Sequence, residues 1–338
     1  MNETLCLKVD EQSAVGEAQR RAAGISRRLG FGEDATGRVS IVARELASNM
    51  VKHAGGGVLV VQPQASSEPA GIEFLALDAG PGMRNVGESL RDGHSTAGSS
   101  GTGLGAVRRF SSALDIYAPP GAGTAVFSRM RATAAEQAPR PGALSIGAVC
   151  VPVHGEEVCG DAWAVHETAA RSLILLADGL GHGRDAAEAA DQAVQTFRVR
   201  AEHGLAEILT ALDTALRPTR GAAVAVAEIV PARDVVTVAG LGNIGGAIYG
   251  GEAARHLTTS DGTAGSGTRE AALRAFPWPA DGMLILHSDG LSSRWDLDDY
   301  AGLRRRHPAL IAGVLFRDHR RPRDDVSVVV VARPQETP

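Results

Sequence analysis

The chain has 338 residues, a formal net charge of −5, 44% hydrophobic residues and 22% charged residues, a composition typical of a globular protein with about two domains. Lysine occurs only at Lys8 and Lys52, which excludes a P-loop nucleotide site because that loop ends in Lys followed by Ser or Thr. Three cysteines are too few for a disulfide framework, and no apolar run reaches the ~20 residues of a membrane helix.

Glycine is abundant, with 41 residues, whereas aromatic residues make up only 4%. This predicts aliphatic cores and many tight turns or close backbone approaches. Residues 1–131 carry 14 Lys+Arg against 13 Asp+Glu, and residues 132–338 carry 20 against 26, so neither half has the basic surface of a nucleic-acid partner. The N-terminal segment lacks the charged-then-apolar order of a signal peptide, and we expect a cytoplasmic protein without membrane contact.

Helices and strands are both predicted in the first half of the chain. Apolar residues at helical spacing predict helices over residues 13–29 and 34–53. Short apolar runs predict strands over residues 58–61, 72–77 and 124–130.

A polar segment over residues 132–142 follows the last of these strands and contains Pro139 and Pro141. Such a composition is typical of a semi-extended linker. We therefore predict one domain over residues 1–131 and a second over residues 143–333.

The second half is richer in predicted strands. Apolar runs predict strands over residues 173–177, 224–230, 235–239, 283–287 and 326–332. Helical spacing predicts helices over residues 185–200 and 205–216.

Two polar positions of the predicted helix 34–53 share one face. Glu45 and Asn49 are four residues apart, with Lys52 near the same stripe and His53 one step around. A carboxylate and an amide on one face can orient a water or hydroxyl and ligate Mg²⁺ through oxygen. On its own, such a pair is more often a solvated helix face.

Glycines surround two further polar features of the first half. The strand 72–77 ends in Asp78, and Gly80 and Gly82 then allow a tight turn; a carboxylate at that strand end can accept a hydrogen bond from an exocyclic amine such as that of adenine. Further along, Gly98, Gly101, Gly103 and Gly105 run directly into a predicted helix, whose N-terminal N–H groups attract phosphate. This loop follows a long Ser/Gly-rich stretch, which argues against a Rossmann dinucleotide site.

In this order and spacing, the segments ARELASNMVKHAGGG, LALDAGPGM and GTGLGAV resemble the N box and the two glycine boxes of the GHKL ATP-binding family, and Gly123-Thr124 is similar to that family's closing Gly-Thr. The N box looks most like the RsbT branch of anti-sigma serine kinases. The resemblance implies Mg-ATP binding, with Asn49 on Mg²⁺, Asp78 on adenine, Glu45 as general base and residues 83–100 as a mobile lid. The phosphate-binding and remaining ATP-site residues that it implies are Gly101, Gly103, Gly105, Leu104, Lys52, His53, Gly80, Gly82 and Thr124.

In the second half, acidic residues occur where predicted strands begin or end. Asp178-Gly179 and Asp289-Gly290 follow strongly apolar strands, Asp161 follows Gly160, and the pair Asp324-Asp325 precedes the last strand. A single Asp-Gly is most often a plain turn. Four acidic sites of this kind favour carboxylates that converge at one end of a sheet, where divalent cations relieve their repulsion and two metals can clamp a phosphoryl group.

The motifs GD, DGxGxG, Gly242-Asn243, SDG and a terminal DD occur in the order seen in the SpoIIE/RsbX branch of Mg/Mn-dependent serine/threonine phosphatases, which residues 143–333 resemble. The resemblance implies two Mn²⁺ or Mg²⁺ ions and a metal-activated water as nucleophile. Asp178 would bridge the metals, Gly179 would ligate through its carbonyl, and Asp289, Asp324 (favoured over Asp325) and Asp161 would complete the set. His182 is a weak candidate for the leaving-group acid, and His287 is expected in the core.

Together the resemblances imply an α+β protein in which a GHKL (Bergerat) α/β sandwich precedes an αββα phosphatase sandwich. The function that they imply is a bifunctional switch, which phosphorylates and dephosphorylates Ser/Thr of a STAS-domain anti-sigma antagonist or stressosome-type protein, in sigma-factor or stress signalling. Two alternatives stay open. The first half can be a non-catalytic ATP-binding module that docks a sigma factor or another regulator, or the two halves can act on different partners.

Overall fold

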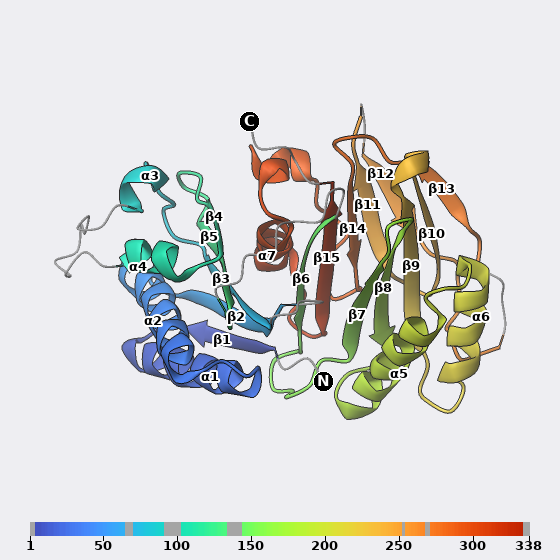
Figure 1. Ribbon diagram of the computed structural model, residues 1–338, viewed down its shortest axis with the longest axis horizontal. Coiled ribbons are helices and arrows are strands. Elements are labelled where there is room, and N and C mark those ends of the chain that lie inside the picture. Colours follow the sequence, from blue (N-terminus) through green and yellow to red (C-terminus); the bar gives the residue numbers. More distant parts are fainter. Residues whose placement is uncertain are drawn as a thin grey trace. The chain divides into compact units, whose positions relative to one another are not determined.

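The computed structural model describes residues 4–64, 70–90, 103–133, 144–251, 254–267 and 271–333 (Figure 1). Contacts between Cα atoms divide the chain into two compact units. Unit 1 consists of Met1–Ala138 and Tyr300–Arg317, and unit 2 consists of Pro139–Asp299 and Asp318–Pro338. The segment 300–317 lies inside the predicted domain 143–333, yet its contacts group it with unit 1.

Unit 1 is built on a five-stranded antiparallel sheet with the strand order β1-β2-β3-β5-β4. Its strands are β1 (Leu5–Val9), β2 (Gly57–Pro63), β3 (Gly71–Asp78), β4 (Ala113–Tyr117) and β5 (Thr124–Arg131). Its helices are α1 (Gln12–Arg28), α2 (Glu33–Asn49), α3 (Val86–Ser89), α4 (Gly103–Phe110) and the first ten residues of α7 (Pro308–His319).

Helices α1, α2 and α4 pack on one face of this sheet and form its main core (Figure 1). Val39, Val42 and Leu46 recur at helical spacing in α2 and are fully or almost fully buried. The helix predicted over 34–53 is α-helical to Asn49 and continues as a π-helical turn over Met50–Ala54. Gly55 ends this turn with a φ of +70°, a left-handed conformation that glycine adopts without strain.

The other face of β3 is also buried, because all eight residues of this strand are buried. Within unit 1 this face meets α7: a Cβ atom placed on Gly313 would lie 3.1 Å from Leu77 Cδ2 and 3.2 Å from Leu75 Cδ2. A glycine at this position therefore lets α7 approach the sheet closely.

Hydrogen bonds and ring stacking connect the start of α7 to β4 and β5. Asp115 accepts hydrogen bonds from the His307 N–H (2.7 Å) and from Arg306 Nη1 (3.2 Å). The His307 ring stacks on Phe127 with its centroid 4.1 Å away, and its Nδ1 accepts the Ala309 N–H at 3.1 Å. His307 therefore caps the N-terminus of α7 while it packs against the sheet.

Unit 2 contains two five-stranded antiparallel sheets with the orders β13-β10-β9-β8-β7 and β12-β11-β14-β15-β6. The first sheet comprises β7 (Asp161–Glu167), β8 (Ser172–Gly179), β9 (Ala222–Val230), β10 (Val235–Leu241) and β13 (Arg274–Pro277). The second comprises β6 (Ser145–Val151), β11 (Gly245–Tyr249), β12 (Arg255–Thr258), β14 (Met283–His287) and β15 (Val326–Ala332).

Side chains of β8 alternate between two cores of unit 2. Leu173 and Leu175 pack against the helices α5 (Arg184–Arg200) and α6 (Leu205–Leu216), whereas Ile174 and Leu176 pack against the second sheet. A strand that is buried on both faces reads as a continuous apolar run, as the sequence of β8 does. The α+β class predicted from the sequence is confirmed.

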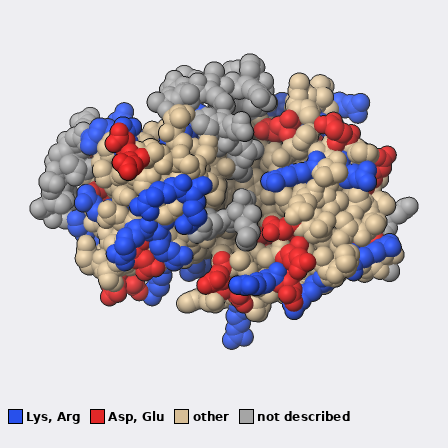
Figure 2. Space-filling model, turned by 60° about the horizontal axis from the view of Figure 1, so that its bottom comes forward, with Lys and Arg blue, Asp and Glu red and all other residues tan. Residues whose placement is uncertain are grey.

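Among the described residues, none of the helices combines the length and the apolar character needed to cross a lipid bilayer. Basic and acidic side chains are both spread over the face seen in Figure 2. This distribution agrees with the small net charge of −5.

Candidate functional site

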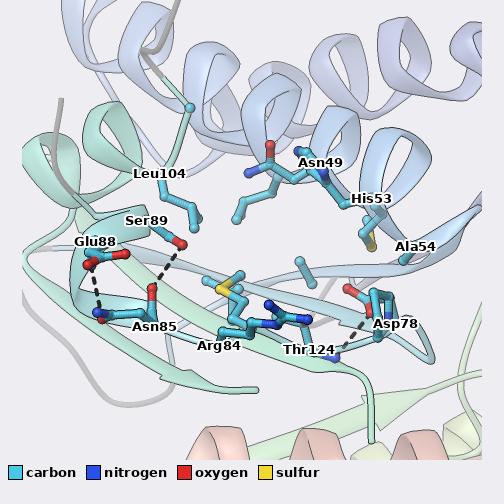
Figure 3. Close-up of a pocket in the computed structure, with 18 residues that line it drawn as sticks. Asn49, His53, Ala54, Asp78, Arg84, Asn85, Glu88, Ser89, Leu104 and Thr124 are labelled. Carbon is cyan, nitrogen blue, oxygen red and sulfur yellow. Dashed lines mark hydrogen bonds between the residues drawn. The ribbon is translucent and has the colours of Figure 1, made fainter. Parts of the chain in front are cut away.

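A cavity of about 420 Å³ opens in unit 1 where α2 and its π-helical turn face the ends of β3 and β5. Its walls also include the loop after β3, α3 and the start of α4. The predicted ATP-site residues that line it are Asn49, His53, Asp78, Gly82, Gly103, Leu104 and Thr124. Figure 3 shows Asn49 and His53 on the helical side of the cavity, with Asp78 and Thr124 on the strand side.

Other predicted ATP-site residues lie outside the cavity wall. Glu45 is ion-paired with the neighbouring Arg44 at 2.8 Å, Lys52 is exposed, and Gly105 is buried in α4. Gly80 is not part of the wall, although its N–H contacts Asp78. Gly101 lies outside the described residues, as do residues 91–100 of the predicted lid.

Asp78 is held in a fixed position at the end of β3. Its Oδ1 accepts the Gly80 N–H at 2.9 Å and the Thr124 N–H at 3.1 Å (Figure 3). Burial raises the pKa of the Asp78 carboxyl, and these two hydrogen bonds and the charges of Arg317 and His53 oppose that rise. With Oδ1 so engaged, Asp78 has a second oxygen with which to accept a hydrogen bond from a ligand.

Asn49 lies beside the first residue of α4. A Cβ atom placed on Gly103 would be 3.7 Å from Asn49 Oδ1. An amide oxygen and a helix N-terminus at one side of a cavity can receive a cation and a phosphate group, respectively.

Gly82 fits its place only because it has no side chain. Its φ is +72°, and a Cβ atom would lie 2.2 Å from the carbonyl oxygen of Pro119. The sequence predicted a tight turn here. The structure gives two reasons for a glycine at this position, the left-handed φ and the close approach of the Pro119 carbonyl.

The described part of the predicted lid segment, residues 83–90, contributes Arg84, Asn85, Glu88 and Ser89 to the cavity wall, although the sequence analysis named none of them individually. The Asn85 side chain accepts the Glu88 N–H at 3.2 Å, and Ser89 Oγ donates to the Asn85 carbonyl at 3.1 Å. Asn followed three residues later by Glu is a known signal for a helix N-terminus. This signal would have predicted α3.

The second group of candidates gathers at strand ends in unit 2. Asp161 opens β7 directly opposite Asp178 in β8, Asp289 follows β14, and Asp324 precedes β15. Burial, and next the negative charge of Asp161, raise the pKa of Asp178 to about 9. Burial, and next the charge of Asp325, raise the pKa of Asp161 to about 7.

Two further residues hold this cluster in place. Asp325 accepts the Val153 N–H through Oδ1 and the Gly160 N–H through Oδ2, both at 2.7 Å. Asn243 Nδ2 donates to Asp289 Oδ2 at 2.6 Å. Because both oxygens of Asp325 accept backbone N–H groups, Asp324 is the better candidate of this pair for a ligand. Asn243, part of the Gly-Asn motif noted in the sequence, was not predicted as a site residue.

The chemistry of the cluster fits a divalent cation. Asp161 Oδ2 is buried and accepts no hydrogen bond from any described residue, and the neighbouring carboxyls raise one another's pKa values. Hard oxygen donors of this kind are the preferred ligands of Mg²⁺ and Mn²⁺. Within the described ranges, however, no three His, Cys, Asp or Glu side chains are arranged as a metal cluster.

The two histidines discussed in the sequence analysis differ in their surroundings. His182 is exposed, with Nδ1 2.9 Å from Glu156 Oε1. His287 is the last residue of β14 and is buried against the edge of Trp295, with ring centroids 5.7 Å apart. Burial lowers the pKa of His287, which agrees with its expected place in the core.

Comparison with known proteins finds two family models that match different parts of the chain. A model of the histidine kinase-like ATPase domain matches residues 9–130, and a model of Stage II sporulation protein E (SpoIIE) matches residues 168–334. The serine/threonine-protein kinase RsbT of Bacillus subtilis is 29% identical over 126 residues, which are 37% of this chain and 95% of RsbT.

Among the solved structures that are similar to this chain, two illustrate matches over more than half of it. A chain from a structure of the bacterial stressosome, described as a modular system adapted to control secondary messenger signalling, is 26% identical with a TM-score of 0.53; the match covers 56% of this chain and 99% of that one. RsbX in complex with magnesium is 18% identical with a TM-score of 0.50, and the match covers 59% of this chain and 98% of RsbX. The predicted GHKL-type and SpoIIE-type folds are thereby confirmed.

Proposed function

Because the chain joins an RsbT-like histidine kinase-like ATPase domain to a SpoIIE-type phosphatase domain, we propose that it is a bifunctional switch. One half would transfer phosphate from ATP to a serine or threonine of a STAS-domain protein, and the other half would remove it. The observation that carries this proposal is that a single chain has both a cavity with Asn49 and Asp78 in its wall and a cluster of carboxyls around Asp178.

In the ATPase half, Asp78 is the residue that would recognise adenine. Its fixed Oδ1 orients the carboxylate, so the other oxygen can accept the exocyclic amine. Asn49, beside the N-terminus of α4, would hold Mg²⁺ near the phosphates. Glu45 would serve as the general base, in line with the RsbT-like N box.

In the phosphatase half, Asp178, Asp289, Asp324 and Asp161 would hold the Mn²⁺ or Mg²⁺ ions, together with the Gly179 carbonyl. Bound metal supplies an activated water at neutral pH and charge to stabilise a phosphoryl group. The chain's own contribution is orientation: Asn243 holds Asp289, and Asp325 fixes the backbone at Gly160, next to Asp161.

The proposed partner class comes from the relatives. RsbT is a serine/threonine-protein kinase, and one similar structure belongs to the bacterial stressosome. We therefore propose a STAS-domain anti-sigma antagonist or stressosome-type protein as substrate, in sigma-factor or stress control.

One observation favours the alternative in which the ATPase half only binds nucleotide and docks a partner. Glu45 pairs with Arg44 and is absent from the cavity wall, whereas a general base has to reach the proton that it removes. The intact Glu45 in an RsbT-like N box favours the kinase.

A phosphate-transfer assay distinguishes these functions. The full chain is incubated with labelled ATP and a candidate STAS protein, alongside Glu45→Gln and Asp178→Asn. Two variants at exposed positions, Glu33→Gln in α2 and Asp191→Asn in α5, serve as matched controls. The bifunctional switch requires transfer that is lost in Glu45→Gln and removal of phosphate that is lost in Asp178→Asn. ATP binding without transfer to the STAS protein would establish the docking module instead.

A further inference from the structure

Two cysteines of unit 2 lie side by side next to the carboxylate cluster. Cys150 belongs to β6, and Cys159 lies in the segment between β6 and β7. Their Sγ atoms are 3.6 Å apart, although the two residues are nine positions apart in the sequence. Both residues are partly exposed, so a small oxidant in solution can reach them.

The thiol of Cys150 also contacts a proposed metal ligand. Its Sγ donates a hydrogen bond to the carbonyl oxygen of Asp161 at 3.4 Å. Asp161 opens β7 directly opposite Asp178, and its Oδ2 accepts no hydrogen bond from any described residue. The pair of thiols therefore adjoins a residue whose carboxylate would bind a cation.

The carboxylate of Asp325 holds both ends of the segment that joins β6 to β7. It accepts the Val153 N–H through Oδ1 and the Gly160 N–H through Oδ2, both at 2.7 Å. Gly160 lies between Cys159 and Asp161 in the sequence. A movement of Cys159 therefore either shifts the backbone of Asp161 or breaks the contact between Gly160 and Asp325.

A disulfide between the two cysteines requires their sulfur atoms to approach each other. A covalent S–S bond is about 2.05 Å long, so the two Sγ atoms have to come closer by about 1.5 Å. Cys150 is held in the ladder between β6 and β15, where it is paired with Ser327. The part of the approach that side-chain rotation does not supply comes from Cys159, which lies outside the strands.

We propose that Cys150 and Cys159 form a disulfide when the chain meets a peroxide, and that this modification weakens metal binding at the carboxylate cluster. Both S–H bonds and the O–O bond of hydrogen peroxide break, one S–S bond forms and two molecules of water leave, so sulfur is oxidised and peroxide oxygen is reduced. The new bond removes the Cys150 donor from Asp161 and draws Cys159 toward β6. The effect on the metal rests on the proposed function, because it takes Asp161 as a metal ligand, whereas formation of the bond does not.

Mass spectrometry tests the formation of the bond. The metal-free full chain is treated with hydrogen peroxide, its remaining thiols are alkylated, and it is cleaved after Glu156 and Glu157, which separate the two cysteines. We expect the peptides of Cys150 and Cys159 to be joined by a bond that a reductant cleaves. Cys6→Ser changes the cysteine of unit 1 and should give the same product, whereas Cys150→Ser should give none. Absence of the joined peptides in both the wild type and Cys6→Ser would overturn the proposal.

Calorimetry with Mn²⁺ tests the effect on the metal, after the peroxide has been removed so that it does not react with Mn²⁺. We expect the oxidised wild type to bind Mn²⁺ about tenfold more weakly than the reduced form, as when a contact of a ligand residue is lost, and a phosphine reductant to restore the affinity. Cys150→Ser keeps a donor for the Asp161 carbonyl but cannot form the bond, so peroxide should leave its affinity unchanged. Equal affinities in the oxidised and reduced wild type, or an equal loss in Cys150→Ser, would overturn the effect on the metal.

The two measurements separate this inference from the proposed function. A reduced wild-type chain that binds no Mn²⁺ contradicts the proposed metal site, and the effect on the metal falls with it, while mass spectrometry still decides whether the bond forms. A chain that binds Mn²⁺ equally well before and after cross-linking contradicts the inference alone. Thermal unfolding of each variant in its reduced form checks that the fold is intact.

Discussion

Single carboxylates at strand ends define both candidate sites. Asp78 ends β3, whereas Asp178 lies near the end of β8 and Asp289 lies two residues after β14. A strand end places a side chain at the edge of a packed core, where burial raises the pKa of a carboxyl and backbone N–H groups can fix its direction. The Asp78 carboxylate receives two such N–H groups. The Asp178 carboxyl instead faces other carboxyls. Asp78 is therefore suited to accept a hydrogen bond from a neutral amine, and Asp178 is suited to bind a cation.

The raised pKa of Asp178 predicts that metal binding releases a proton. With a pKa of about 9, this carboxyl is protonated at pH 7 in the metal-free chain, and a cation has to displace the proton in order to be ligated. We expect the apparent enthalpy of Mn²⁺ binding at pH 7 to change with the ionisation enthalpy of the buffer, with a slope of about one and a half protons: about one from Asp178 and about half from Asp161, whose pKa is about 7. Calorimetry in Pipes and in Tris, which differ in ionisation enthalpy and do not precipitate Mn²⁺, measures this slope.

Asp178→Asn is the informative variant for this release, because asparagine has the same shape and no titratable proton. Its slope should fall by about one proton, while the exposed Asp191→Asn should match the wild type. Equal slopes in Asp178→Asn and wild type would assign the released proton to another group.

Substitution of Gly121 and Gly123 by alanine distinguishes two costs of adding a Cβ atom, the strain of a left-handed φ and the steric clash with neighbouring atoms. Both have left-handed φ values, +78° and +81°, but a Cβ atom at Gly121 meets nothing within 4 Å, whereas at Gly123 it lies 2.2 Å from the Asp78 carbonyl oxygen. We expect Gly121→Ala to cost about 1 kcal/mol of unfolding free energy from φ alone. Gly123→Ala should cost about 3 kcal/mol, since the backbone has to move as well.

Urea denaturation of the two glycine variants measures both costs. Similar losses in Gly121→Ala and Gly123→Ala would mean that the chain around Asp78 relaxes freely. That result would also weaken the view of the Asp78 backbone as a fixed point contacted by Arg317.

At the scale of elements, the sequence predicted the regular helices and strongly apolar strands well. Helix α6 and strands β14 and β15 have the predicted bounds, and α2, α5 and β8 differ by a few residues at their ends. Their signal is a clear period or a continuous apolar run. In the candidate sites, the same signals placed Asp78 and Asp178 at strand ends.

The elements that were missed lack such a signal. Helix α7 has residues 308–316 buried on every side, so it has no polar face and no amphipathic period. Strand β12 is short and largely exposed, in the pattern of an edge strand. The contacts of Arg317 with Asp78 and of Asn243 with Asp289 join residues far apart in the sequence, and local pattern contains no information about them.

The cap of α7 predicts a pH dependence of stability. Burial, and next the charge of Arg129, lower the pKa of His307 from 6.5 to about 3. Below pH 6.5 the unfolded chain gains a proton on this histidine and the folded chain does not, so the contribution of His307 is present above pH 6.5 and is lost as the pH falls toward 3. Between pH 7 and pH 5.5 this single group should remove about 1 kcal/mol of unfolding free energy.

His307→Asn tests this dependence, because asparagine can cap a helix and does not titrate. Urea denaturation at pH 7 and pH 5.5 measures the unfolding free energy of both proteins. The value for the wild type minus the value for the variant should be about 1 kcal/mol lower at pH 5.5 than at pH 7. A difference that stays constant with pH would show that His307 is protonated in the folded chain as readily as in the unfolded one.

At the scale of the whole molecule, unit 1 is not a contiguous stretch of sequence. The ATPase family model matches residues 9–130, yet the unit also contains residues 300–317. A fragment that ends near residue 138 therefore lacks the segment that packs on Leu75 and Leu77. These two leucines are 1% and 2% exposed in the full chain, and without α7 they would form part of an uncovered apolar sheet face.

We predict opposite effects of one double substitution, Leu75→Thr with Leu77→Thr, in two chains. In the isolated fragment 1–138, the wild-type sequence should bind a hydrophobic dye and self-associate, and the double variant should reduce both because threonine keeps strand propensity with less apolar surface. In the full chain the same change should cost at least about 2 kcal/mol of unfolding free energy, because it removes buried contacts with α7. Dye fluorescence, sedimentation and urea denaturation give the three readouts. A wild-type fragment that is monomeric and binds no dye would mean that residues 300–317 are dispensable for unit 1, and unit 1 would then match the contiguous ATPase family model.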